Sequence, residues 1–331
     1  MKRIFITGGT GFIGQHIVRQ LAGEGFEVRA LARKTSDVRG IKVEGVETVE
    51  GDVRDAGSLE KALRGAEAVV HAAALVGEWG RARDFQDINV KGTANVLAAM
   101  RTAGVRRLID VSTCSVHGYE GKDRTDETAP HVKTGVLYSD TKVEAEKLVW
   151  EAHGRGEVVA TAIRPVMVWG PGDRAFLAKL IGMMRSGVFT YIGSGDNVAG
   201  LCHARNVAEI IMLAIGNEKS AGEAFLVNDG CGTTYRELAE AIADRMKLRV
   251  RYVRVPYGAA KLAGSASETF FRAAGRRTAP LVTKMGVAVL GNNLSYSIEK
   301  ARRVLRYEPV ARFPGGLDEY ISWYRGTFMS G

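Results

Sequence analysis

The chain has 331 residues, of which 46% are hydrophobic and 25% are charged, and these values exclude a disordered or fibrous protein. No stretch reaches the roughly 18 unbroken apolar residues that span a bilayer, and the apolar run at residues 4–6 is too short for a secretory signal. The formal net charge of +9 is spread along the chain without a nucleic-acid-binding motif. These features predict a cytoplasmic protein that has no nucleic-acid partner.

The three cysteines, Cys114, Cys202 and Cys231, are far apart in the sequence and odd in number. A disulfide framework needs paired cysteines, and a metal site needs closely spaced ligands. We therefore expect thiols without a structural role, and no metal cofactor.

Short β-rich runs alternate with amphipathic helices through the first half of the chain. The expected strands cover residues 3–7, 27–32, 46–50, 68–73, 107–112 and 158–164. The expected helices cover residues 12–23, 58–63, 85–102 and 139–153, with Ser58 as N-cap of the second and Gly104 ending the third. This alternation is typical of a parallel sheet with helices on both faces. Residues 1–165 are therefore predicted to form a doubly wound α/β domain.

The regular alternation of strands and helices ends after residue 165. Glycine and proline punctuate the chain around residues 170–172 and 193–195, and two further strands are expected at 224–228 and 249–255. We predict that residues 166–331 form a smaller, mixed C-terminal lobe that binds the substrate, with some segments returning to the first domain.

A glycine-rich turn, Thr7-Gly8-Gly9-Thr10-Gly11-Phe12-Ile13-Gly14, joins the first strand to the first helix. Glycine permits a tight turn and a close approach of backbone N–H groups, and a helix N-terminus carries positive partial charge. A dinucleotide pyrophosphate needs both properties. The turn therefore predicts a Rossmann-type dinucleotide site whose contacts include Gly8, Thr10, Gly11, Phe12, Ile13 and Gly14.

The end of the second strand indicates which dinucleotide binds. Proteins that bind NAD usually place an acidic residue there to hold the ribose 2′-hydroxyl, whereas this chain has Ala32-Arg33-Lys34. A cationic Arg33, with Lys34 beside it, suits the 2′-phosphate of NADP(H), which we therefore favour over NAD(H). The alternative is a solvated Arg33 in an NAD site that lacks the carboxylate.

Asp52 and Val53 follow the third strand, where the adenine is expected to lie. The Asp52 carboxylate could accept a hydrogen bond from the adenine amino group. The alternative is an aspartate that only makes a local turn.

Tyr138 and Lys142 are four residues apart and hence on one helical face. A nearby ammonium lowers the pKa of a phenol, so Lys142 is expected to let Tyr138 exchange a proton with a substrate hydroxyl or carbonyl. Thr113, at the end of the fifth strand, could hold the same substrate oxygen. We predict that Thr113, Tyr138 and Lys142 are the catalytic residues.

These motifs together resemble those of the extended short-chain dehydrogenase/reductase family, and the resemblance covers nearly the whole chain. It rests on residues 7–14, 51–53, 71–74, 89–93, 111–118, 138–142, 164–172, 203–208, 300–301 and 307–309. The resemblance implies that Thr113, Tyr138 and Lys142 form a catalytic trio. It also implies that Ala72, Ala73 and Ala74 line the cofactor and that the segment from Pro165 to Val168 approaches the nicotinamide.

Within that family the chain is most similar to the dihydroflavonol-reductase and 3β-hydroxysteroid-dehydrogenase branches. Nucleotide-sugar epimerases usually carry Asp where Ala32 stands. Nucleotide-sugar 4,6-dehydratases carry Asp-Glu where this chain has Cys114 and Ser115, so dehydration loses its acid and base. His117 departs from the family, which commonly has Tyr at that place.

Further substrate contacts are expected from three segments. Val76 and Trp79 follow the fourth strand and should edge the substrate site, with Trp79 acting as an apolar wall, a lid anchor or a packed side chain. Met167 lies beside the nicotinamide segment and joins Cys114 and Ser115 as a candidate contact.

Arg205 is the last candidate substrate contact, because in sugar-nucleotide relatives it would face a substrate phosphate. His203 stands beside it near the predicted cleft, and we expect a packed or solvated side chain there rather than a catalyst.

Segment 257–285 is apolar with scattered arginine and lysine. We favour a core-packing helix pair in the small lobe. The alternative is a mobile apolar lid that touches a membrane surface. The helices at 84–102 and 139–153 could pair two copies of the chain, as they often do in relatives.

The sequence thus predicts an NADP(H)-dependent oxidoreductase that interconverts a secondary alcohol and a ketone or aldehyde, with Tyr138 as acid and base. The small-molecule substrate is expected to be mid-sized and partly apolar. A nucleotide-sugar epimerase with tightly bound NAD is the alternative, because the same trio could oxidise and re-reduce a sugar carbon. A non-catalytic, cofactor-binding regulatory protein is a second alternative, against which the intact trio argues.

Overall fold

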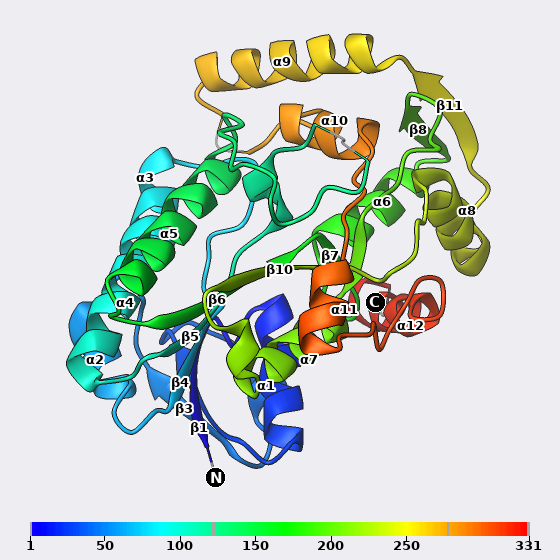
Figure 1. Ribbon diagram of the computed structural model, residues 1–331. Coiled ribbons are helices and arrows are strands. Elements are labelled where there is room, and N and C mark those ends of the chain that lie inside the picture. Colours follow the sequence, from blue (N-terminus) through cyan, green and yellow to red (C-terminus); the bar gives the residue numbers. More distant parts are fainter. Residues whose placement is uncertain (1, 121–122, 277, 330–331) are drawn as a thin grey trace.

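A seven-stranded parallel sheet forms the centre of the molecule (Figure 1). The computed structural model describes residues 2–120, 123–276 and 278–329. Neighbouring strands are parallel throughout, in the order β10-β6-β5-β4-β1-β2-β3. The strands are β1 (Arg3–Thr7), β2 (Glu27–Ala32), β3 (Val46–Glu50), β4 (Ala68–His71), β5 (Arg107–Val111), β6 (Val159–Pro165) and β10 (Glu223–Val227). This arrangement confirms the predicted doubly wound α/β fold.

Helices cover both faces of the sheet because successive side chains along a strand point to opposite faces. Ile4 and Ile6 of β1 belong to the core under α1, α7 and α11, whereas Phe5 between them belongs to the core under α2, α4 and α5. The helices on the first face are α1 (Phe12–Gly23), α7 (Ala204–Ile215) and α11 (Glu299–Leu305). Those on the second face are α2 (Ala56–Ala62), α4 (Lys91–Ala103) and α5 (Leu137–Gly154).

The strand order determines where a ligand binds. β1 lies between β2 and β4, and the helices that follow β1 and β4 leave on opposite faces of the sheet. Open α/β sheets bind their ligands beyond the carboxyl ends of the strands at such a switch point. The glycine turn after β1 and the segment after β4 both lie there.

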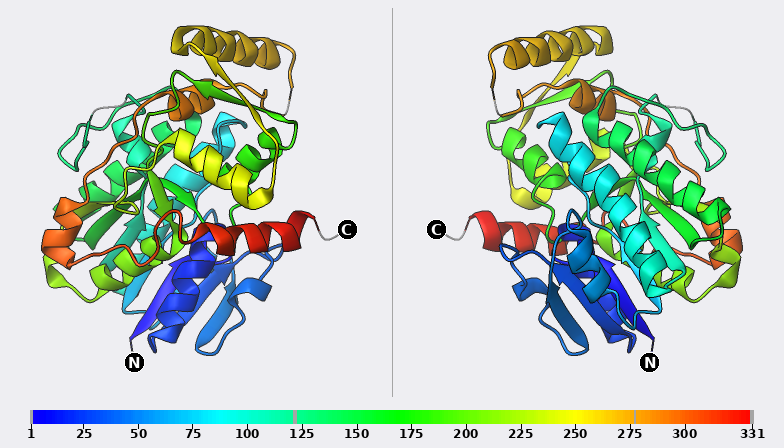
Figure 2. Two further views of the ribbon diagram at one scale, coloured as in Figure 1. Left: turned by 90° about the vertical axis from the view of Figure 1, so that its right-hand side faces the viewer. Right: turned by 90° about the vertical axis from the view of Figure 1, so that its left-hand side faces the viewer.

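The second half of the chain builds a smaller lobe (Figures 1 and 2). Its core gathers Trp169, Phe189 and Tyr320. The strands of this lobe form two parallel pairs, β7 (Met167–Trp169) with β9 (Leu201–His203) and β8 (Val188–Ile192) with β11 (Arg251–Val255). Its helices are α6 (Phe176–Met184), α8 (Tyr235–Met246), α9 (Tyr257–Ala273), α10 (Lys284–Gly291) and α12 (Leu317–Phe328). Strand β10 and helix α7 come from the same half of the chain but join the large sheet.

Short irregular helical segments connect these elements. They are the 3₁₀ turns η1 (Arg39–Ile41), η3 (Cys114–His117) and η4 (Glu218–Ser220), the single turn α3 (Ala82–Phe85) and the π-helical η2 (Gln86–Val90). The described helices include none whose length and apolarity would let it cross a bilayer.

Two helix boundaries differ from the sequence prediction. Ser58 is not the N-cap of α2: Asp55 is, because its carboxylate accepts a hydrogen bond from the Gly57 amide, while the Ser58 hydroxyl donates to the Asp55 carbonyl. The helix predicted at 85–102 is interrupted by the π turn at Gln86–Val90. Gly104 ends α4 in the left-handed conformation, with a φ of 70°, as predicted.

Candidate active site and dinucleotide-binding turn

The glycine turn lies in close contact with the end of β4. Gly8 has a φ of 74°, and its carbonyl accepts a hydrogen bond from the Gly11 amide at 3.0 Å. A Cβ atom on Gly8 would lie 2.6 Å from backbone atoms of Ala72 and Ala73, and one on Gly14 would overlap the Gly8 carbonyl oxygen. Only glycine therefore lets β1, α1 and the segment after β4 meet at this point.

The geometry of the turn fits a dinucleotide pyrophosphate. Gly11 is the N-cap of α1, and no side chain caps the first amides of the helix. Uncapped amides at a helix N-terminus need acceptors and favour an anion. Thr10 lies in this turn, and Phe12 and Ile13 begin α1. Their contacts with the cofactor stay a prediction.

Arg33 follows β2 directly and is exposed. Its backbone amide donates to the Ser36 hydroxyl at 3.2 Å, while its guanidinium makes no hydrogen bond or ion pair with the residues that the structure describes. Lys34 beside it is also exposed. Both cations are therefore available to an anionic group at the end of β2.

Asp52 makes the local turn that was the alternative to an adenine contact. Its carboxylate accepts hydrogen bonds from the Arg54 guanidinium, with a shortest distance of 2.7 Å, and from the Arg54 amide at 3.0 Å. The Arg54 side chain, and more weakly Arg33, lower the pKa of the Asp52 carboxyl. Val53 is buried, and a Cβ on Gly92 would press on it. The adenine contact stays a prediction.

A buried hydrogen-bond chain runs from β1 to the helices behind the site. The Thr7 hydroxyl lies 2.7 Å from Nδ1 of His71, and Nε2 of His71 lies 2.9 Å from the Thr93 hydroxyl. The Thr93 hydroxyl donates to the Asn89 carbonyl at 2.7 Å, so His71 Nε2 must be the donor to Thr93. Burial, and then the charge of Lys142, lower the pKa of His71 to about 3, so His71 is neutral and structural.

Asn89 connects this hydrogen-bond chain to α5, the helix that carries Tyr138 and Lys142. Its side-chain oxygen accepts from the Leu75 amide at 2.7 Å, and its amide nitrogen donates to the Leu75 carbonyl and to the Thr141 hydroxyl, the latter at 3.0 Å. The π turn at Gln86–Val90 contains Asn89. The sequence contained both His71 and Asn89 in matching motifs, but nothing in the spacing indicated that they contact one another through Thr93.

The predicted catalytic residues converge at the start of α5. Thr113 follows β5, and the Tyr138 phenol lies against its hydroxyl. Lys142 is one helical turn beyond Tyr138 and is 3% exposed. Its ammonium donates to the Val111 carbonyl at 3.0 Å and lies 4.0 Å from the Asp110 carboxylate.

The predicted lowering of the Tyr138 pKa by Lys142 is wrong for this structure. Burial raises the pKa of the phenol above its ordinary value, and the neighbouring Tyr119 raises it further, while the hydrogen bond with Thr113 opposes both. The ammonium is drawn instead toward the Val111 carbonyl and Asp110. Tyr138 is therefore protonated at neutral pH.

Charged side chains are buried beneath the predicted catalytic residues. Burial would raise the pKa of Glu146, but hydrogen bonds from His131, Arg164 and Ser112 bring it below its ordinary value. Asp110 lacks such partners: neither of its carboxylate oxygens has a hydrogen bond within the described residues. Burial raises the pKa of Asp110 to about 6 although Lys142 and Arg164 lower it and Glu146 adds to the increase.

His117 takes part in this buried layer. Its Nε2 atom lies 3.1 Å from the Arg164 guanidinium, and its pKa is lowered to about 4, first by burial and then by the Arg164 charge. His117, which stands where the family commonly has Tyr, therefore contacts the Arg164 side chain.

Tyrosines lie near the Tyr138 phenol and near the neighbouring Cys114 thiol, and the sequence did not indicate them. The Tyr119 hydroxyl lies 2.7 Å from that of Ser139, and burial raises its pKa to about 12. Tyr296, from the C-terminal part of the chain, contacts the thiol of Cys114, whose own pKa burial raises to about 12. Tyr119 and Tyr296 belong to no recognisable motif. They are far apart in the sequence, and only the folded chain brings them close to each other.

The loop after β4 is anchored to the outer helices. The Arg272 guanidinium lies 4.6 Å from the centre of the Trp79 ring, and the Trp79 indole N–H donates to the Arg276 carbonyl at 3.3 Å. Glu78 pairs with Lys179 at 3.1 Å. Val76 is exposed at the tip of this loop. Trp79 therefore connects this loop to the C-terminal end of α9 and the residues just after it. Its part in substrate binding stays a prediction.

The remaining predicted residues come from three places near the carboxyl ends of the strands. Pro165 is the last residue of β6, and Met167 and Val168 begin β7 just after it. The Ser115 hydroxyl accepts a hydrogen bond from that of Thr113 at 3.2 Å. Ala74 lies between the end of β4 and Leu75.

Arg205 is not placed as predicted. Its guanidinium pairs with Glu319 of α12 at 2.9 Å on the side of the sheet opposite α5. His203 beside it is buried against Trp169 and caps α7, as expected for a packed residue. These contacts give no support to a substrate phosphate at Arg205.

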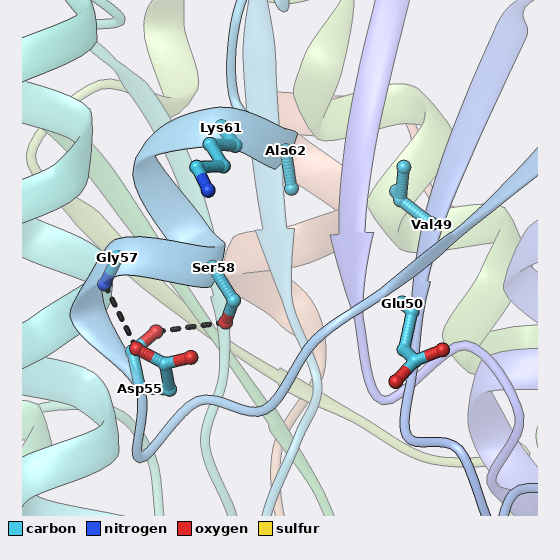
Figure 3. A pocket seen from close by; sticks show the side chains of 7 residues that line it. All are labelled: Val49, Glu50, Asp55, Gly57, Ser58, Lys61 and Ala62. Atoms are coloured by element: carbon cyan, nitrogen blue, oxygen red, sulfur yellow. Dashed lines mark hydrogen bonds between the residues drawn. The ribbon is translucent and has the colours of Figure 1, made fainter.

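A surface pocket lies apart from this site (Figure 3). It lies between β3 and α2 and is lined by Val49, Glu50, Asp55, Gly57, Ser58, Lys61 and Ala62. None of the predicted catalytic, cofactor or substrate residues lines it. Its hydrogen bonds, from Gly57 to Asp55 and from Ser58 to Asp55, are those that begin α2.

The sequence profile of the NAD-dependent epimerase/dehydratase family matches residues 4–230, which carry the glycine turn and the predicted catalytic trio. The chain belongs to this family. The family is NAD(P)-dependent and forms part of the extended short-chain dehydrogenases/reductases, so the earlier resemblance is confirmed.

Full-length relatives narrow the class of reaction. The chain is 31% identical over 319 residues to a 4-hydroxy-2-methyl-3-oxo-4-farnesyl-3,4-dihydroquinoline-1-oxide ketoreductase of Stigmatella aurantiaca, covering 96% of this chain and 95% of that protein. It is 31% identical over 324 residues to a 2-alkyl-3-oxoalkanoate reductase of Stenotrophomonas maltophilia, covering 95% and 97%. It is 30% identical over 343 residues to a 3-beta-hydroxysteroid dehydrogenase of Mycolicibacterium neoaurum, covering 99% and 93%. The protein is therefore an oxidoreductase of this family.

Solved structures agree with this assignment. A dTDP-glucose 4,6-dehydratase from Streptomyces venezuelae, determined with NAD bound, superposes with a TM-score of 0.78 at 26% identity, covering 98% of this chain and 97% of that chain. The fold is therefore that of a dinucleotide-binding short-chain dehydrogenase/reductase.

We expect Gly14→Ala to weaken dinucleotide binding by at least about tenfold, because the new Cβ would overlap the Gly8 carbonyl and force the turn open. Gly23→Ala is the matched control, since a Cβ there meets nothing within 4 Å. Calorimetric titration with NADPH and NADH, together with the melting temperature, measures both effects. Equal affinities in the two variants would show that the turn does not hold the cofactor.

Asp110→Asn is expected to stabilise the fold in a pH-dependent way. The folded-state pKa of about 6 exceeds the ordinary value of 3.8, so ionising Asp110 costs stability as the pH rises from about 4 through about 6. The stability of the variant relative to the parent should therefore increase by up to about 3 kcal/mol over that interval and stay level above it. Urea unfolding at a series of pH values measures this difference; a constant difference would contradict the burial of an unsatisfied carboxylate.

Proposed function

We propose that this enzyme is an NADP(H)-dependent reductase that converts a ketone on a mid-sized, partly apolar substrate to a secondary alcohol. The observation that carries the proposal is the environment of Tyr138, a phenol beside Thr113 whose pKa is raised by burial. A protonated phenol at neutral pH is a proton donor, and reduction of a carbonyl requires one.

The residues of the turn support binding of the dinucleotide. Its pyrophosphate would rest on the uncapped amides at the start of α1, Ala72 to Ala74 would line it, and Pro165 and Val168 would approach the nicotinamide. Arg33, together with Lys34, would hold the 2′-phosphate, since its guanidinium has no partner within the described residues. When bound, the reduced nicotinamide supplies the hydride.

The protein's own residues would handle the proton. The carbonyl carbon gains the hydride, and the carbonyl oxygen gains the proton of the Tyr138 hydroxyl, so that the product is a neutral secondary alcohol. Thr113 would orient the carbonyl oxygen. Lys142, one helical turn beyond Tyr138, would support the nucleotide and balance the phenolate that remains until solvent returns a proton.

The surroundings of Tyr138 support an apolar substrate. Tyr119 and the protonated thiol of Cys114 lie near the phenol, Tyr296 contacts that thiol, and none of the three carries charge at neutral pH. The named substrates of three relatives carry a farnesyl chain, an alkyl chain or a steroid nucleus. Val76, Trp79, Ser115 and Met167 would border such a substrate.

We also propose a cytoplasmic homodimer formed through α4 and α5. The two helices lie next to each other on one face of the large sheet (Figure 2). Sedimentation velocity with a charge reversal on the exposed side of α5, such as Lys147→Glu, tests this pairing: the dimer should dissociate.

Tyr138→Phe is expected to lower kcat for ketone reduction by about 10² or more while the Kd for NADPH changes little, because only the proton donor is lost. In the parent enzyme, reduction should stay level into the alkaline range, whereas alcohol oxidation should increase with pH, since oxidation needs the phenolate. Tyr252→Phe, on β11 of the smaller lobe, is the control. A Tyr138 variant with normal turnover would rule out this residue as the acid.

Arg33→Ala is expected to lower the affinity for NADP(H) by at least about tenfold and the affinity for NAD(H) much less. Only NADP(H) carries a 2′-phosphate for the guanidinium to bind. Arg39→Ala is the matched control, since Asp37 already pairs with that guanidinium at 2.7 Å. Fluorescence titration gives the four affinities. Equal losses for both cofactors in the Arg33 variant would reject the 2′-phosphate contact.

A further inference from the structure

Helix α9 presents an apolar face to solvent. At 3.6 residues per turn its buried residues, Ala260 and Gly264, lie on one side, and the outer face of α9 lies opposite them. That outer face consists of the exposed residues Ala259, Leu262, Ala263, Ala266, Thr269, Phe270 and Ala273, of which only Thr269 is polar. Leu262 is 72% exposed and Phe270 is 67% exposed. A surface helix ordinarily has the reverse pattern, with its apolar stripe against the core.

The position of α9 leaves this face open. Figures 1 and 2 show α9 as the outermost layer of the small lobe, at the end of the molecule away from the N-terminus. On its inner side it rests on α10 and β8 through a small core of Ala260, Ile192 and Val287. In the segment between α9 and α10, Leu281 is also exposed, at 76%.

Cations border the outer face of α9. Lys261 and Arg272 lie on one flank of the helix, and Arg276 and Lys284 follow it; all four are exposed. Between residues 257 and 285 the sequence has a single carboxylate, Glu268, which accepts a hydrogen bond from the Lys284 amide at 2.7 Å. The region is thus apolar at its centre and cationic at its edge, although Arg277 lies outside the described residues.

This charge pattern distinguishes between two possible occupants. A second copy of the chain packed through a two-fold axis would bring the same cationic flanks together, and like charges oppose such contact. An anionic lipid surface would accept Leu262 and Phe270 among its acyl chains and attract the lysine and arginine side chains. We propose that the outer face of α9 docks the enzyme reversibly on an anionic lipid surface.

Docking would act close to the loop after β4, which borders the substrate in the proposed function. Arg272 and Arg276, at the end of α9, hold Trp79 of the loop after β4, and the hydroxyl of Thr283, which precedes α10, binds Glu78 of the same loop. If the substrate is apolar, as the proposed function has it, the lipid surface is also its source. The docking surface itself does not depend on that function.

Vesicle sedimentation tests the proposal without turnover. The protein should sediment at least about tenfold more with vesicles of phosphatidylglycerol and phosphatidylcholine than with phosphatidylcholine alone, and high salt should reduce the binding. The double variant Leu262→Asp/Phe270→Asp should lose it. Val310→Asp, at another residue that is 58% exposed, is the control and should keep it.

Three outcomes would overturn the proposal: no binding by the parent protein, binding that the double variant retains, or a lower oligomeric mass of the double variant in light scattering, which would make a second copy the occupant. Melting temperature and NADPH affinity verify that the double variant is folded. Vesicle binding without any ketone reduction would leave the docking surface standing and reject the proposed function alone.

Discussion

The buried hydrogen-bond chain from Thr7 through His71, Thr93 and Asn89 to Thr141 is the constraint on which the site depends. It starts at the last residue of β1, where the glycine turn begins, and ends on α5, one residue before Lys142. The turn would hold the cofactor, and α5 holds the proposed proton donor. Because the chain is buried and its groups are satisfied, it fixes the distance between the two without a flexible connection. The neutral state of His71 follows from the same burial.

Burial also determines the chemistry at the end of that chain. In water, a lysine one turn from a tyrosine would favour the phenolate. Here the Lys142 ammonium is held by the Val111 carbonyl and lies near Asp110, while the Tyr138 phenol sits among Tyr119, Cys114 and Thr113. Desolvation of the phenol is then the larger effect, and it keeps the proton in place. The same uncharged surroundings that favour an acid also favour an apolar substrate, so both parts of the proposed function follow from one cause.

The sequence predicted the sheet, the glycine turn and the convergence of Thr113, Tyr138 and Lys142 because each depends on local patterns: alternation of strand and helix, glycine where backbone must approach backbone, and a spacing of four on a helix. The sequence predictions were wrong where tertiary contacts determine a helix boundary or the partner of a side chain. Asp55, three residues before Ser58, caps α2, and the π turn places Asn89 where a regular helix was expected. Arg205 reaches Glu319, which no spacing rule could indicate. Tyr119 and Tyr296 come from segments almost 180 residues apart, and only the folded chain brings them to one site.

The most direct test of the account follows the hydrogen that moves. NADPH carrying deuterium at both positions of nicotinamide C4 is incubated with the enzyme and a ketone that has a long alkyl chain, and the product is analysed by mass spectrometry. The account predicts one deuterium on the carbinol carbon for each NADPH consumed, and loss of this transfer in Tyr138→Phe. Product without deuterium, or a changed substrate with no net consumption of NADPH, would contradict it and indicate internal oxidation and re-reduction instead.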